Sequence, residues 1–198
     1  DAAIAGYQSV VEADPADHGS WHVLALLLHQ GRRFAAARQA IEQAVAIQPA
    51  NPHYRQAKLA MLGETGLFVE RYQAALAAVE IVSDDPSLWT ELSIAAGAID
   101  RFEDAETAFE RAVAIDPLFG RAYGERAMLL DRLGRLDEWE ALLERAEQAG
   151  ADDDEVLFAR ALLLFRRRRP ELAATVLASV GDGINPRSEE HTSELQSR

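Results

Sequence analysis

The sequence predicts an all-α protein built from repeated pairs of antiparallel helices. Two stretches of the 198-residue chain match when one is shifted by 68 positions, which is twice 34. A period of 34 residues is typical of repeats that consist of two short helices. The recurring pairs are Trp21 with Trp89, Phe34 with Phe102, Ala37 with Ala105, Ala44 with Ala112 and Pro49 with Pro117.

Each repeated residue has a physical role in such a helix pair. Small residues such as Ala37 and Ala105 allow two helices to approach closely, while bulky neighbours fill the gaps beside them. Pro49 and Pro117 lack an amide hydrogen and therefore end the second helix of a pair. Because one repeat cannot bury its own apolar face, we expect the repeats to stack into a solenoid.

Counting Pro49 as repeat position 32 places position 1 at His18. The residues that then occupy the characteristic slots are Trp21, Leu24, Ala25, Leu28, Ala37, Ile41 and Ala44. This pattern resembles the tetratricopeptide repeat family. The resemblance implies a right-handed superhelix of five full repeats and one half repeat, with a concave surface lined by the first helix of each pair (helix A).

The resemblance also implies one continuous array over residues 1–186. Residues 1–17 correspond to the second helix (helix B) of a truncated repeat, so we expect Tyr7 and Val10 to expose an apolar face. Full repeats follow at 18–51, 52–85, 86–119, 120–153 and 154–186.

The repeat at 52–85 departs from the pattern. Arg55 and Lys58 stand where apolar residues are expected, and Arg71 stands at the small position 20. A shift of three or four residues would place alanines on the packed face, so we predict an irregular or lengthened turn over Gly63–Glu70. Drift of the repeat is the favoured explanation, and a local change of curvature that suits a partner is the alternative.

Residues 187–198 break the helical pattern, and the string RSEEHTSELQS resembles the translation of a sequencing-library adapter. We expect this tail not to be native and exclude it from functional arguments. The formal net charge is −13 for the chain and −12 without the tail, which holds two Arg and three Glu. This acidity disfavours nucleic acid and anionic lipid as partners and favours basic or apolar ligands.

Absent motifs narrow the function further. The sequence has no cysteine, no membrane-length apolar run, no glycine-rich phosphate loop and no His-Glu-x-x-His or Gly-x-Ser-x-Gly motif. We therefore predict no catalytic residue and no cofactor, and a cytoplasmic location, with export left open because Asp1 is not a start methionine. His18, His22 and His29 share a helix face, but no acidic residue beside them completes a metal site, so none is predicted.

The run Arg166–Arg169 is the dense basic cluster of the sequence. We interpret it as cations at the negative end of a helix dipole, followed by Pro170 at the start of the next helix. The alternative is a site for a phosphate- or sulfate-bearing partner.

The family resemblance implies a binding groove lined by helix A positions 2, 5, 9, 12 and 13. Position 9 is apolar in every repeat, which suits an amphipathic helix or an extended peptide, although part of this stripe could equally be core. The residues His22, Leu26, Ala57 and Glu91 do not match the Lys, Asn and Arg clamp of family members that hold chaperone carboxylate tails. The candidate groove residues are His22, Leu26, His29, Gln56, Ala60, Thr90, Ile94, Met128, Phe158, Leu162 and Phe165.

The sequence thus predicts a scaffold that binds a protein or peptide partner, with a second copy of the chain as a further candidate partner. An alternative comes from residues 157–186, which resemble the last repeats before the sulfotransferase domain of some bacterial proteins. In that case the chain would be the non-catalytic arm of an enzyme, because no phosphosulfate-binding loop is present in it.

Overall fold

The computed structural model describes residues 2–182, and within that range it contains helices and no strand. The helices are α1 (Ala2–Ala13), α2 (His18–Gln30), α3 (Phe34–Ile47), α4 (Pro52–Glu64), α5 (Phe68–Ile81), α6 (Pro86–Ala98), α7 (Phe102–Ile115), α8 (Gly120–Arg132), α9 (Leu136–Ala149), α10 (Asp154–Arg166) and α11 (Pro170–Asp182). The predicted all-α repeat fold is confirmed. The tail at 187–198 and the Gly-Ile-Asn-Pro at 183–186 lie outside the described residues.

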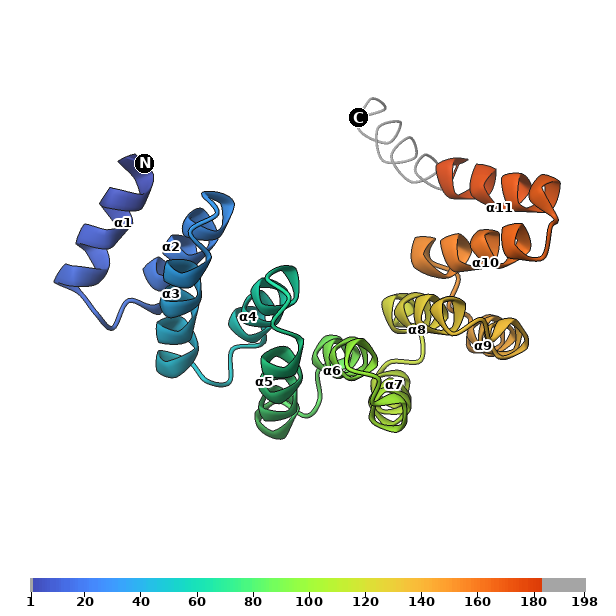
Figure 1. Cartoon of the computed structure of the whole chain (residues 1–198), viewed down its shortest axis with the longest axis horizontal. Coiled ribbons are helices and arrows are strands. Elements are labelled where there is room, and N and C mark those ends of the chain that lie inside the picture. The colour runs from blue at the N-terminus through green and yellow to red at the C-terminus, as the bar shows by residue number, and fades with distance from the viewer. Residues whose placement is uncertain (1, 183–198) are drawn as a thin grey trace, which may run out of the picture. The chain divides into compact units, whose positions relative to one another are not determined.

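The contacts divide the chain into two compact units, the first ending at Ile115 and the second beginning at Asp116. The first unit contains the half repeat α1 and the hairpins α2/α3, α4/α5 and α6/α7. The second unit contains the hairpins α8/α9 and α10/α11. Figure 1 shows both helices of each hairpin running side by side.

Polar caps define where several A helices begin. The carboxylates of Asp17 and Asp85 and the amide oxygen of Asn51 accept backbone N–H groups from the first turns of α2, α6 and α4. Pro52 and Pro86 then occupy the first helical turn, where a missing N–H costs nothing. Asp153 caps α10 in the same way, through the N–H of Val156.

Each hairpin turns through three residues, and the middle residue has a left-handed backbone. The residues with positive φ at this place are Arg32, Gly66, Asp100, Gly134 and Arg168. In the second full repeat the turn is 65–67, between the end of α4 at Glu64 and the start of α5 at Phe68. The predicted irregular or lengthened turn over Gly63–Glu70 is therefore wrong, because this turn has the same length as the other four.

The second repeat keeps its register because Arg71 is accommodated rather than displaced. Its guanidinium donates to the Glu91 carboxylate at 2.6 Å, and both side chains are largely buried. Gly63 provides the space, since a Cβ on Gly63 would lie 2.8 Å from Arg71 Nη1. A buried charge needs such a partner, so this ion pair joins α5 to α6 and explains the tolerated arginine.

The size of the residue at position 20 governs how closely two helices of a hairpin approach. With Ala37 and Ala105 in this position, α2/α3 and α6/α7 make extensive close backbone contact. With Arg71 and Trp139 there, the close contact of α4/α5 and α8/α9 is less extensive. Bulk at this position therefore moves two helices apart without breaking the hairpin.

One hydrogen bond recurs at the start of four of the five full repeats. The side chain at position 4 donates to the carbonyl oxygen six residues earlier, at position 32 of the preceding repeat. The bonds are Trp21 Nε1 to Pro15 O, Arg55 Nε to Pro49 O, Trp89 Nε1 to Ser83 O and Tyr123 Oη to Pro117 O. Arg55 therefore fits the repeat pattern, because its guanidinium makes the same hydrogen bond as the indoles of Trp21 and Trp89.

The half repeat α1 packs on α2 through one face. Ile4 and Val11 are buried there. Tyr7 is half-buried and packs against the same core, whereas Val10 is 42% exposed, so the expected exposure of apolar side chains is confirmed for Val10 and not for Tyr7.

Candidate functional site

In the second unit, three of the predicted groove residues surround one pocket. Met128 comes from α8, and Phe158 and Leu162 come from α10. The pocket has a volume of about 90 Å³, so it suits a single bulky side chain rather than a whole ligand. We call it the α8–α10 pocket.

The rim of this pocket is both apolar and accessible. Met128 is 59% exposed and Phe158 is 56% exposed. Phe165, two turns further along α10, is also exposed. Apolar side chains grouped in this way on a surface are typical of interaction sites.

Small residues create the pocket. Gly124 has no side chain to fill the space between α8 and α10, and a Cβ there would lie 3.3 Å from Glu155 Cβ. Ala127 and Ala159 line the walls, and the buried Trp139 of α9 contributes the remaining apolar surface. Sequence reasoning missed these four residues, although a glycine at the groove position 5 is a signal that could have identified the gap.

Charged side chains border the α8–α10 pocket. Arg121, Glu125 and Glu155 are among its lining residues. Asp153 lies at the N-terminus of α10, and burial raises its pKa. The hydrogen bonds that its carboxylate accepts from the N–H groups of Val156 and Gly120 lower the pKa and partly offset this effect. Asp153 therefore holds the first turns of α10 and α8 together beside the pocket.

In the first unit, the two predicted groove histidines, His22 and His29, already contact side chains of the protein itself. The His22 ring lies 4.8 Å from the Tyr54 ring, and burial lowers the pKa of His22, with a further contribution from the charge of His53. His18 Nδ1 is hydrogen-bonded to the Tyr54 hydroxyl at 2.8 Å. His29 Nε2 lies 3.4 Å from the Glu64 carboxylate. Over residues 2–182, no three His, Asp or Glu side chains meet in a metal-binding group.

The remaining predicted groove residues of the first unit differ in exposure. Leu26 and Ala60 are exposed, whereas Gln56 and Ile94 are half-buried. Thr90 is only 1% exposed, and its hydroxyl donates to the Pro86 carbonyl at 2.9 Å. The prediction that Thr90 lines the groove is wrong, because its side chain is core.

The arginine cluster is engaged in ion pairs within the second unit. Arg166 Nη2 lies 2.7 Å from Asp131 Oδ2, and Arg167 donates to Asp137 and Glu140. These carboxylates raise the pKa of both guanidinium groups, with hydrogen bonding as the largest cause. Two of the four arginines therefore bind α10 to the preceding hairpin, which agrees with a structural role.

The fold and the site together define an array of helical hairpins with the architecture of a protein-binding scaffold. A family model described as tetratricopeptide repeat matches residues 1–52 and 90–154. These segments make up more than half of the chain, so it belongs to the tetratricopeptide repeat family. Residues 53–89 and 155–198 are not matched, and the first of these segments contains the repeat with Arg55 and Arg71.

Solved structures with the same fold cover almost the whole chain. PilW, a widely conserved type IV pilus biogenesis factor, is 18% identical with a TM-score of 0.67, over 96% of this chain and 88% of PilW. TTC0263, a thermophilic TPR protein from Thermus thermophilus, is 20% identical with a TM-score of 0.66, over 91% and 97%. YrrB, described as a TPR protein with an unusual peptide-binding site, is 15% identical with a TM-score of 0.56, over 95% and 97%. No curated protein matches the chain.

Proposed function

We propose that this chain is a protein-interaction scaffold that holds a partner peptide or helix on its A helices. The α8–α10 pocket receives one bulky apolar side chain of the partner, such as leucine or phenylalanine. The observation that carries the proposal is that Met128, Phe158 and Leu162 surround one pocket while the first two remain more than half exposed. Such a pocket can act as the anchor of a larger interface.

The surroundings of the pocket support a peptide partner. Phe165 extends the apolar surface along α10, so an amphipathic helix or an extended peptide could continue beyond the anchor. The fold supports the same conclusion, since solenoids of this kind present long binding surfaces. No helix among residues 2–182 is long and apolar enough to cross a membrane.

Selection from a displayed library of random 12-residue peptides tests this proposal. We expect enrichment of peptides with a conserved bulky apolar residue, and a loss of binding of about ten-fold or more in Phe158→Ala, because an anchor side chain contributes about 2 kcal/mol. Leu172→Ala is the matched control, since Leu172 is another half-exposed apolar side chain of the second unit that does not line the pocket. Equal binding by wild type and a Met128→Ala/Phe158→Ala double variant would refute the proposal.

The alternative, that the array precedes a sulfotransferase domain in a longer protein, is supported by the resemblance of residues 157–186. It is tested by sequencing the gene beyond the codon for Pro186. A reading frame that continues into a phosphosulfate-binding loop supports it, and a stop codon or unrelated sequence contradicts it.

A further inference from the structure

A larger pocket lies in the first unit, between α1 and α3, with α2 at its base. It has a volume of about 520 Å³, within the range of ligand sites in proteins. Its base is formed by Trp21, Leu24 and Leu28, which lie on a different face of α2 from the groove residues His22 and Leu26. This α1–α3 pocket is therefore separate from the predicted groove.

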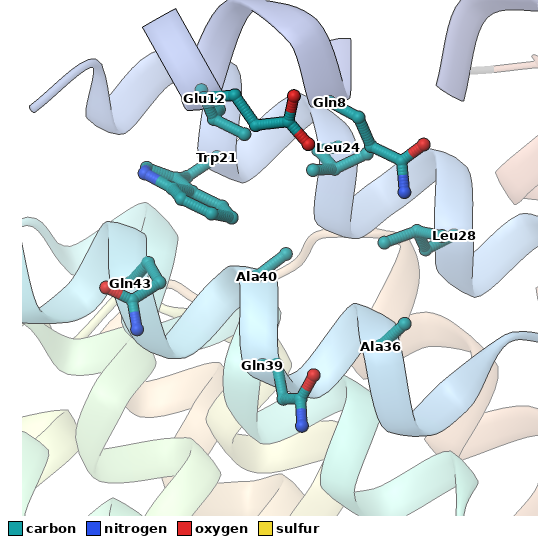
Figure 2. A pocket seen from close by; sticks show the side chains of 10 residues that line it. Gln8, Glu12, Trp21, Leu24, Leu28, Ala36, Gln39, Ala40 and Gln43 are labelled. Carbon is teal, nitrogen blue, oxygen red and sulfur yellow. The ribbon is translucent and has the colours of Figure 1, made fainter. Parts of the chain in front are cut away.

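The walls of the α1–α3 pocket carry polar side chains above an apolar base. Gln8 and Glu12 project from α1, Gln39 and Gln43 come from α3, and Figure 2 shows the side chains of α2 between these two helices. Val11, Ala36 and Ala40 add apolar surface. The described lining thus holds three amides and one carboxylate, and it includes no cationic side chain.

The spacing of these polar groups fits an extended chain. Gln39 and Gln43 are four residues apart in a helix, which corresponds to about 6 Å along the axis. Gln8 and Glu12 have the same separation. In an extended peptide, groups on the same side recur every two residues, or about 6.6 Å.

The chemistry of an amide side chain fits the same occupant. An amide both donates and accepts hydrogen bonds, and an extended peptide offers unpaired N–H and C=O groups along its length. A helix satisfies these groups internally and would leave the glutamines without backbone partners. The amides of Gln8, Gln39 and Gln43 therefore favour an extended ligand over a helical one.

We propose that the α1–α3 pocket binds an extended peptide with alternating apolar and basic residues. The apolar side chains lie on the half-buried Trp21, beneath which Leu24 and Leu28 are buried, and a lysine or arginine lies beside the Glu12 carboxylate. The formal net charge of −12 without the tail attracts such a basic peptide and repels an acidic one. This second site does not depend on binding at the α8–α10 pocket.

Three acetylated and amidated peptides provide the probes, namely Leu-Lys-Val-Lys-Leu and its counterparts with Glu or Ser in place of both Lys. Titration of the whole chain is followed by NMR chemical shifts, with the Trp21 indole N–H as the reporter of the pocket. We expect the Lys peptide to shift the Trp21 signal and to bind at least ten-fold more tightly than the Glu peptide, with affinity that falls as salt is raised.

Variants assign the effect to the pocket. Glu12→Gln is expected to reduce the Lys-over-Glu preference to less than three-fold, and Gln39→Ala/Gln43→Ala to weaken the Lys peptide about five-fold. All three positions are exposed, so these variants leave the core intact. Gln73→Ala is the matched control, because Gln73 occupies in α5 the repeat position of Gln39 in α3 but does not line the pocket.

Several outcomes would overturn the proposal. They are failure of all three peptides to bind at millimolar concentration, equal affinity for the Lys and Glu peptides, or an unchanged preference in Glu12→Gln. Shifts confined to Met128 and Phe158 would also overturn it, because they would place the basic peptide in the α8–α10 pocket. Unchanged binding of the Lys peptide to the Phe158→Ala variant would show that this peptide does not use the α8–α10 pocket.

Discussion

At the scale of single residues, charged side chains inside the array are held by specific partners. Arg71 is the clearest case, because it occupies a slot that holds alanine in the two neighbouring repeats and is paired with Glu91 across two repeats. The pair is largely buried, so each charge depends on the other.

We expect Glu91→Ala to lower the free energy of unfolding by about 3 kcal/mol, since it leaves the Arg71 guanidinium buried without this carboxylate. The double variant Arg71→Ala/Glu91→Ala should recover part of that loss, because no charge remains buried. Urea unfolding of the wild type, the two single variants and the double variant measures the interaction free energy between Arg71 and Glu91. Additive effects of the two substitutions would contradict this account.

The left-handed turn residues allow a second prediction. Arg32 has φ of 57°, a conformation that costs a non-glycine residue energy and glycine almost none. Arg32→Gly should therefore stabilise the chain by about 0.5–1 kcal/mol, and Gly66→Ala should destabilise it by a similar amount, because a Cβ there meets no atom within 4 Å and the effect is purely conformational. Arg32→Ala, measured by the same denaturation, reports any loss from the side chain itself.

The His22 imidazole gives a third prediction, on pH dependence. Burial lowers its pKa below 6.5, so the unfolded chain binds a proton more readily than the folded chain. As the pH falls below 6.5, this residue makes the folded state progressively less stable. Urea unfolding from pH 7.5 to 5.5 should show this slope, and His22→Gln should reduce it. An NMR titration giving His22 a pKa of 6.5 or higher would contradict the prediction.

At the scale of helices and turns, local sequence predicted the hairpins well, because their periodic apolar and small residues contact neighbours within the same 34 positions. It failed where the partner lies outside the repeat. Arg71 finds Glu91 in the next repeat, and Arg55 donates to Pro49 O in the preceding repeat. No local pattern predicts those contacts, and the sequence alone therefore predicts an irregular turn that the structure does not contain.

The candidate site was also predicted only in part from the sequence. Met128, Phe158 and Leu162 follow from the family register, whereas Trp139 enters the α8–α10 pocket from a helix B. Thr90 occupies a groove position by register but is core in the structure, because neighbouring helices cover it. The α1–α3 pocket depends on the space between two helices of different repeats, which the sequence does not specify.

Position 20 gives the prediction at this scale. Ala37 and Ala105 are fully buried where two helices approach closely, so Ala37→Leu or Ala105→Leu should cost about 1–3 kcal/mol through overpacking. Ala36→Leu is a suitable control, because Ala36 is only half-buried on the adjacent position. Thermal unfolding of the three variants checks this, and unchanged stability in both position-20 variants would show that the assigned register is incorrect.

At the scale of the whole molecule, the two compact units predict that damage in one is felt mainly there. Trp139 is fully buried in the second unit, so Trp139→Ala should cost about 3–5 kcal/mol. Hydrogen exchange should show the loss of protection within residues 116–182, with little change in residues 2–115.

Trp139→Phe is the control, since its buried indole N–H has no hydrogen-bond partner among the described residues. It should lose far less protection than the alanine variant. An equal loss across both units of Trp139→Ala would contradict the prediction.

The hydrogen bond from position 4 to the preceding repeat has a consequence for inheritance. The acceptor is a main-chain oxygen, which every amino acid provides, and the donor has been an indole, a guanidinium or a phenol. Any codon change that leaves a donor side chain at position 4 therefore keeps the bond, whereas Leu157 in the last repeat has no donor. A segment of 34 residues that carries such a donor can accordingly be duplicated or exchanged between genes and still form this bond with its new neighbour.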